Sequence, residues 1–226
     1  MLPNETPHTP DDHPYASRGG LKLEAALRAF GLDVANHTCA DLGCSTGGFT
    51  SCLIHHGAAR VFAVDTAYGE LAWAMRQHDR VTVMERSNAL HTDPHPDAAQ
   101  GVDLVVIDLG WTRQAKALPA ALKWLKPNVT VGGSPPDDAH APTRPGQIIT
   151  LVKPHYERPS ETGGRRKGER KRPPMPEDEA RAVCEQVLAS IDADAALGLR
   201  VVGVIDSPLA GGKGGNLERL ALLQRR

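Results

Sequence analysis

The sequence predicts an α/β protein with a Rossmann-like, mostly parallel sheet, and three features point to this class. A glycine-rich stretch, DLGCSTGGF at residues 41–49, lies between a short apolar run and a segment with helical spacing. Several apolar runs of strand length, of which residues 103–109 form the clearest, end in charged or polar side chains. Amphipathic segments separate these runs. This succession is typical of parallel strands joined by helices, with ligands bound at the carboxyl ends of the strands.

The length and composition indicate one globular domain without a metal site. At 226 residues, the chain is long enough for a buried core. Its four cysteines form no C-x-x-C pair and have no histidine at zinc-ligand spacing, and the adjacent His55 and His56 would point away from each other on a helix. No apolar run approaches the ~20 residues that span a bilayer, and the polar, proline-rich start does not resemble a secretory signal. We therefore expect a cytoplasmic protein with no membrane partner.

The glycine-rich stretch predicts a cofactor loop. Gly43, Gly47 and Gly48 allow a tight turn and a close approach of the backbone to a ligand, because they carry no Cβ. Ser45 stands where the dinucleotide fingerprint needs its second glycine, and no Gly-Lys-Ser/Thr follows, so neither NAD nor a P-loop nucleotide is favoured. Asp65 ends the next strand, where a carboxylate can accept both hydroxyls of a ribose. This pattern favours S-adenosylmethionine, and the alternative is a glycine-rich turn without a ligand.

Periodicity and turn signals divide the chain into elements. The first 14 residues are expected to be a disordered tail, and residues 15–226 to form the domain, with loop insertions at about 126–146 and 160–176. The last two strands flank a glycine-rich turn and predict a hairpin at one edge of the sheet. The first expected helix has Arg18 and Lys22 near its start and ends at Gly31. Further helices are expected over residues 50–56, 71–75, 118–125 and 177–191, and strands over residues 38–42, 60–65, 81–85, 103–109, 147–154, 200–206 and 217–223.

Five polar residues stand at a helix start or at strand ends, and each has a functional and a purely structural interpretation. Arg18 and Lys22 lie near the start of the first helix, where the macrodipole disfavours cations. Their presence there indicates a functional role, either in contacting a phosphate or in tuning a neighbouring amine. Asn88 is either a contact to an adenine edge or a turn residue. Asp108 is either a carboxylate at the ligand edge or a helix cap. Lys153, which a proline follows, is either a functional amine or a solvated rim residue.

A strongly basic run, Arg165 to Arg172, is the candidate RNA contact. The net charge of the whole chain is −1, so any RNA binding must rest on local basic patches. Runs of this kind are usually solvated loops, but this one would hold phosphates with a salt-dependent affinity.

Several distinctive segments resemble one family. From about Tyr15 to the C-terminus, the chain contains in this order YASRGGLKLEAAL, DLGCSTGGFTSCLIHHGA, VFAVDTAYGELAWAMR, MERSN, DLVVIDL, LVKPHYE and SPLAGGKGGNLE. These segments resemble the motifs of the TlyA-type (haemolysin A-like) branch of the FtsJ-like ribosomal RNA 2′-O-methyltransferases. The resemblance implies a class I methyltransferase sheet of seven strands with an antiparallel last strand. It also implies S-adenosylmethionine as the donor of a methyl group to a ribose 2′-hydroxyl, with ribosomal RNA or ribosomal subunits as the partner.

The resemblance further implies a catalytic tetrad at Lys22, Asp108, Lys153 and Glu218. Lys153 would be the general base that takes the proton of the attacking hydroxyl, and it must be neutral to act. Lys22 would favour that neutral form as a second cation, while Asp108 and Glu218 would orient the amines and the hydroxyl. The expected cofactor contacts are Asp41, Gly43, Ser45, Thr46, Gly47, Gly48, Phe49, Asp65, Asn88 and Asp108.

The chain departs from the family pattern on the acceptor side. The family begins with a small RNA-binding module upstream of SRGGLKL, where this chain has a short polar tail, so we expect target recognition to rest on the catalytic face, the basic run or a separate partner. After Asp108, the family's Ser-Phe-Ile-Ser-Leu is replaced by Gly-Trp-Thr-Arg-Gln at residues 110–114. The family's Gln-Phe after Lys-Pro is His155-Tyr156 here, and Leu90 replaces an arginine.

Two other functions stay open on the sequence alone. One is a non-catalytic protein that binds RNA or the ribosome on a methyltransferase scaffold, which the altered acceptor loops permit but the intact tetrad argues against. The other is a methyltransferase with a non-RNA acceptor, because a fold does not determine its substrate.

Overall fold

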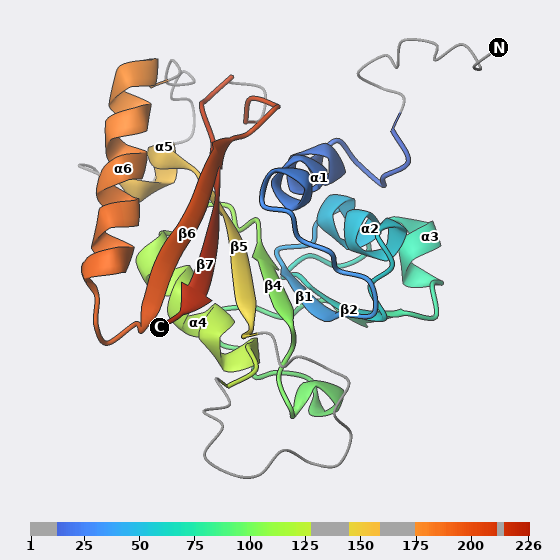
Figure 1. The fold of residues 1–226 in the computed structure, drawn as a ribbon. Coiled ribbons are helices and arrows are strands. Elements are labelled where there is room, and N and C mark those ends of the chain that lie inside the picture. Colours follow the sequence, from blue (N-terminus) through green and yellow to red (C-terminus); the bar gives the residue numbers. More distant parts are fainter. Residues whose placement is uncertain (1–12, 128–144, 159–174, 212–214) are drawn as a thin grey trace, which may run out of the picture.

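The structure is a computed structural model, and it describes residues 13–127, 145–158, 175–211 and 215–226. The basic run, and most of the expected tail and loop insertions, therefore lie outside the described residues. A seven-stranded sheet runs through the molecule in the order β3-β2-β1-β4-β5-β7-β6 (Figure 1). The strands are β1 (Thr38–Leu42), β2 (Arg60–Val64), β3 (Val81–Met84), β4 (Leu104–Ile107), β5 (Gln147–Val152), β6 (Leu199–Asp206) and β7 (Arg219–Arg225).

Every pair of neighbouring strands is parallel except those that include β7. β1 pairs in parallel with β2 and β4, β2 with β3, and β4 with β5. β7 is antiparallel to both β5 and β6, and β6 forms the edge of the sheet. This arrangement confirms the predicted mostly parallel sheet with an antiparallel last strand, and it confirms the predicted hairpin at one edge.

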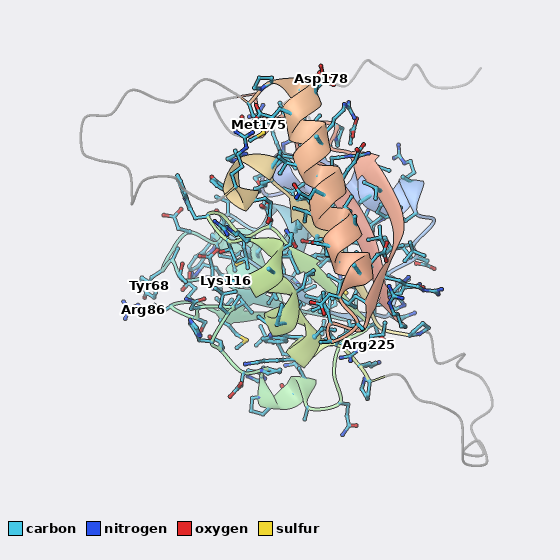
Figure 2. The ribbon with its side chains drawn as sticks, turned by 90° about the vertical axis from the view of Figure 1, so that its left-hand side faces the viewer. Tyr68, Arg86, Lys116, Met175, Asp178 and Arg225 are labelled. Carbon is cyan, nitrogen blue, oxygen red and sulfur yellow. The ribbon has the colours of Figure 1, made fainter. Side chains whose placement is uncertain are left out.

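Helices cover both faces of the sheet. α1 and α2 contribute Leu23, Leu27 and Leu53 to the core on one face, while α4 and α6 contribute Leu118 and Leu188 on the other. Figure 2 shows α4 and α6 side by side over that second face. None of the helices in the described ranges has the length and apolar character needed to cross a membrane. The helices are α1 (Gly19–Ala29), α2 (Gly48–His55), α3 (Trp73–Arg76), α4 (Gln114–Trp124), α5 (Pro154–Glu157) and α6 (Glu177–Ala193), with the 3₁₀ turn η1 (Pro96–Ala98).

β4 shows why this sequence forms a central parallel strand. Its four residues are all buried. Val105 and Ile107 pack in the layer of α4 and α6, while Leu104 and Val106 pack in the layer of α1 and α2. Because side chains alternate between the two faces of a strand, an apolar residue at every position needs cover on both faces. The strand therefore lies between two helical layers, and the polar Asp108 follows at its carboxyl end.

Element boundaries differ from the sequence-based expectation mainly at the carboxyl edge of the sheet. β4 and β5 end before Asp108 and Lys153, and β7 begins just after Glu218, because the loops diverge from the sheet where these polar side chains stand. The helix expected at residues 71–75 begins two residues later, at Trp73, and ends at Arg76. Within it, Trp73 is 73% exposed, whereas the preceding Leu71 is buried in the core. The apolar run therefore indicated the helix correctly, but Leu71 lies before its start.

Candidate active site

A cavity of about 740 Å³ opens at the carboxyl ends of the parallel strands. It lies beside β1, which has β2 on one side and β4 on the other, so that the order of the strands reverses there. Loops diverge at such a switch point and leave room for a ligand. Of the residues predicted to contact the cofactor, only Asp41 and Gly47 do not line the cavity. Those that do are Gly43, Ser45, Thr46, Gly48, Phe49, Asp65, Asn88 and Asp108.

The loop between β1 and α2 forms the floor of the cavity and depends on its glycines. Gly43 has a φ of 94°, and a Cβ at this position would lie 2.7 Å from the carbonyl oxygen of Asp108. Gly47 has a φ of 93° and is the N-cap of α2, where a Cβ would lie 2.7 Å from Cδ1 of Leu71. Only glycine combines a left-handed backbone with such close approaches. The loop therefore packs directly against the end of β4.

The start of α1 packs against the start of α2 and completes one wall of the cavity. A Cβ on Gly48 would lie 2.4 Å from Oγ of Ser17 and 2.9 Å from the amide nitrogen of Gly20. The Ala16 N–H donates a hydrogen bond of 2.9 Å to Oγ of Ser51 in α2. The N-cap of α1 is Arg18, so the preceding Ser17 does not cap the helix. Ser17 lines the cavity instead.

Asp65 and Asn88 stand on the cavity wall beyond the ends of β2 and β3. The Asp65 carboxylate accepts hydrogen bonds of 2.8 Å from the backbone N–H groups of Ser45 and Ala67, one on each oxygen. These bonds fix its orientation and leave lone pairs for a ligand. The side-chain oxygen of Asn88 accepts the N–H of Leu90 at 3.0 Å, which is the geometry of a turn residue. Asn88 therefore fits both interpretations, since it makes the turn and also lines the cavity.

Asp41 lies behind the glycine loop instead of in the cavity. Its side chain is completely buried, and Oγ1 of Thr50 donates a hydrogen bond of 2.6 Å to one carboxylate oxygen. The other oxygen has no hydrogen-bond partner among the described residues. Burial raises the pKa of Asp41 to about 7, although the bond from Thr50 lowers it and the charge of Asp108 raises it further. Asp41 therefore supports the loop through Thr50 and does not face the cavity.

The four predicted catalytic side chains form two ion pairs. Lys153 donates a hydrogen bond to the Asp108 carboxylate, and both residues line the cavity. Lys22 of α1 lies 2.5 Å from the carboxylate of Glu218, which is 4% exposed. A Cβ on Gly211 would overlap Glu218, so glycine leaves room for this carboxylate. Each pair joins a cation and an anion from different elements of the chain.

A second, smaller cavity adjoins the first. It has a volume of about 210 Å³, and its walls include Arg18 and Lys22. It shares Ser17 and Gly19 with the larger cavity. Lys22 of one ion pair therefore lines a cavity that adjoins the cavity lined by Lys153 and Asp108 of the other.

Trp111 and Tyr156 are site residues to which the sequence analysis assigned no role. Trp111 lines the cavity with its side chain 81% exposed, and its ring centroid lies 4.8 Å from that of Tyr156 in α5. Beside this contact, the Gln114 N–H donates a hydrogen bond of 2.9 Å to Glu157. Burial raises the pKa of Glu157, and the bond from Gln114 partly offsets that shift. The signal that pointed here was the departure from the family pattern in both segments.

No group of three or more His, Cys, Asp or Glu side chains in the described part of the chain is arranged to hold a metal ion. All four cysteines are free and buried. Burial raises the pKa of Cys184 to about 11 and that of Cys52 to about 12, so these thiols keep their protons at neutral pH.

Comparison with known proteins places these motifs in a family. A profile of the FtsJ-like methyltransferases matches residues 15–163. The 16S/23S rRNA (cytidine-2′-O)-methyltransferase TlyA of Mycobacterium tuberculosis is 42% identical over 149 residues, which are 66% of this chain and 49% of that protein. YqxC of Bacillus subtilis, provisionally named an rRNA methyltransferase, is 35% identical over 207 residues, which are 91% of this chain and 64% of YqxC. The chain thus spans about half of the first relative and less than two thirds of the second.

Solved structures agree with this result. A protein of Streptococcus thermophilus, provisionally named a hemolysin, superposes with a TM-score of 0.72 at 34% identity and covers 95% of this chain and 68% of its own. The N-methyltransferase NodS of Bradyrhizobium japonicum has a TM-score of 0.55 at 16% identity, with 95% and 98% covered, and supports the fold alone. Because the family profile covers more than half of the chain and YqxC matches most of it, the chain belongs to the FtsJ-like methyltransferase family.

Proposed function

We propose that the protein is an S-adenosylmethionine-dependent methyltransferase that transfers a methyl group to a ribose 2′-hydroxyl of ribosomal RNA. The observation that carries this proposal is the Lys153–Asp108 pair on the wall of the cavity formed by the glycine loop. An alkyl hydroxyl is a weak nucleophile at neutral pH, so its methylation benefits from an amine that accepts its proton beside the donor. The names of the Mycobacterium and Bacillus relatives, which refer to rRNA methyltransferases, favour the same acceptor class.

The cavity residues fit S-adenosylmethionine. Asp65, held by two backbone N–H groups, keeps lone pairs for the two hydroxyls of the donor's ribose. Asn88 lies on the same wall, where its amide can meet an adenine edge. Gly43 and Gly48 leave space at the floor that a Cβ would fill, and the N-terminus of α2 suits the carboxylate of the methionine moiety. When bound, the donor supplies a methyl group on a sulfonium and leaves as S-adenosylhomocysteine.

Lys153 would take the proton of the attacking 2′-hydroxyl. Asp108 holds its amine at the cavity wall, and Glu218 holds the amine of Lys22 beside the adjoining cavity. Both carboxylates would keep the amines aligned as the proton moves. Much of the acceleration should still come from holding the hydroxyl oxygen in line with the methyl group.

The acceptor side carries two features that suit RNA. The exposed ring of Trp111 at the cavity offers a surface on which a base can stack. Arg18 and Lys22 supply positive charge to the adjoining cavity, where a phosphate group of the same strand would be attracted. The basic run at residues 165–172 lies outside the described residues, and its contact with RNA stays a prediction.

The experiment is to measure transfer of a labelled methyl group from S-adenosylmethionine to unmodified rRNA and to isolated ribosomal subunits. We expect label that survives as a 2′-O-methyl nucleoside after digestion, and no label with Lys153→Ala. Transfer to bases instead of riboses would contradict the assigned acceptor group. If no RNA is labelled although S-adenosylhomocysteine binds, the protein has a different acceptor or acts by binding alone.

A further inference from the structure

Tyr156 adds a polar group at the acceptor side that the proposed mechanism does not use. It lies in α5, and its N–H donates a hydrogen bond of 2.9 Å to the carbonyl oxygen of Lys153. Its ring contacts that of Trp111, and Trp111 lines the cavity together with Lys153 and Asp108. The family pattern has phenylalanine at this position, so the chain differs there by one hydroxyl group.

The charges of Lys153, Asp108 and Glu218 act on the hydroxyl of Tyr156, which makes no hydrogen bond to any of the three. It has no hydrogen-bond partner among the residues that the structure describes. Burial raises its pKa above the ordinary value, with Lys153 opposing this shift and Glu218 and Asp108 adding to it. The phenol therefore keeps its proton at neutral pH and is able to donate a hydrogen bond.

This hydroxyl differs from that of the buried Tyr15, which lies 3.5 Å from Nε2 of His56. A tyrosine hydroxyl that is taken out of water usually finds a partner. Tyr156 is partly buried, and the charged side chains that act on its hydroxyl, Lys153, Asp108 and Glu218, come from three separate segments of the chain. A partner for its proton would therefore arrive with the acceptor.

We infer that Tyr156 is an acceptor-binding residue, whose hydroxyl donates a hydrogen bond to an oxygen of the acceptor nucleotide beside Trp111 and the Lys153–Asp108 pair. This inference rests on the proposed function, because it assigns a contact to the acceptor of that reaction. The contact would help to hold the 2′-hydroxyl in line with the methyl group, where small misplacements slow transfer strongly. Phenylalanine would keep the ring contact with Trp111 and lose only this bond.

The test compares the wild type with Tyr156→Phe. We expect kcat/KM for RNA to fall about tenfold, as for loss of one hydrogen bond to a charged or strongly polar partner. The Kd of S-adenosylhomocysteine and the Tm should be unchanged, because neither the donor side nor the core loses a contact. Tyr15→Phe makes the same chemical change away from the cavity and should leave the transfer rate at the wild-type level.

Three results would overturn the inference. Equal kcat/KM for wild type and Tyr156→Phe would remove the hydroxyl from the reaction and leave the proposed function intact. A loss of transfer that comes with weaker binding of S-adenosylhomocysteine or a lower Tm would mean that the hydroxyl supports the fold. An absence of transfer to any RNA by the wild type would end the proposed function and this inference together.

Discussion

The donor side and the acceptor side of the candidate site are built in different ways. The floor of the donor side is backbone from one continuous loop, in which Gly43 and Gly47 have φ values of 94° and 93°. The acceptor side consists of side chains from distant parts of the chain, such as Lys22 and Glu218, which are separated by 196 residues. Donor binding therefore depends on local conformation, whereas the acceptor side depends on how the whole sheet is assembled.

Substitutions on the donor side and on the acceptor side should therefore have different effects on donor binding, stability and methyl transfer. A change in the loop should weaken donor binding and lower stability, because the same backbone carries both. A change in an acceptor-side side chain should slow transfer and leave the donor bound, because those side chains stand at the rim and not in the floor. Four variants would break or sharpen this comparison, and they follow in order of expected effect.

The largest effect is expected for Lys153→Ala. Transfer should fall by about 10²- to 10⁴-fold, the usual contribution of a general base. Calorimetry should give an unchanged Kd for S-adenosylhomocysteine, since the Lys153 amine is bonded to Asp108 on the acceptor side. Lys123→Ala, which removes an exposed amine paired with Asp93, is the matched control and should transfer at the wild-type rate. Loss of donor binding in Lys153→Ala would mean that the two halves are not separable.

Gly43→Ala should abolish donor binding and lower the stability of the fold. The new Cβ would lie 2.7 Å from the carbonyl oxygen of Asp108, and the backbone has a φ of 94°. We expect the free energy of unfolding to fall by about 2–4 kcal/mol, and donor binding to be lost in calorimetry. Gly69→Ala is the matched control, because its φ is 77° but a Cβ there would have nothing within 4 Å. That control should lose only about 1 kcal/mol, and an equal loss in both variants would mean that the close approach to Asp108 does not matter.

Asp41→Asn should change how stability depends on pH. The folded protein holds the Asp41 proton up to a pH of about 7, whereas the unfolded chain releases it near the ordinary value of 3.8. Between these values the folded state binds more protons, so the wild type loses stability as the pH rises and the loss is complete above pH 7. Relative to the wild type, the variant should therefore gain up to about 4 kcal/mol between pH 4 and pH 8. Urea unfolding at both pH values measures this, and a constant difference would mean that Asp41 is ionised throughout.

The smallest effect is expected for Trp111→Ala. Loss of one stacking surface should raise the KM for RNA by about five- to tenfold, at the low end of the range for base stacking. Binding of S-adenosylhomocysteine should be unchanged, because Trp111 is an exposed side chain at the rim. Trp111→Phe keeps an aromatic ring and should restore most of the RNA affinity. If both variants behave alike, the ring is not a stacking surface.

The order of strands and helices could be predicted from the sequence, and so could most of the donor side. The continuous apolar run of β4 and the glycine-rich turn are local signals, so the carboxyl edge and the positions of Asp65 and Asn88 followed from them. The role of Asp41 could not be predicted, because the local sequence of a carboxylate at a strand end is the same whether its side chain faces a cavity or a buried hydroxyl. The structure places it against Thr50, behind the loop. Trp111 received no role, although its segment departs from the family pattern, because nothing local distinguishes an exposed tryptophan at a cavity from one in the core.

By itself, the sequence determined the strands, the glycine loop and the family resemblance, since periodicity, turn chemistry and motif order are properties of short segments. Only the tertiary structure decided which charges meet. Lys22 reaches Glu218 because β7 inserts between β5 and β6, and Trp111 reaches Tyr156 because β4 and β5 are neighbours. The physical reason is that a contact between distant residues depends on strand order and loop path, which no short segment encodes.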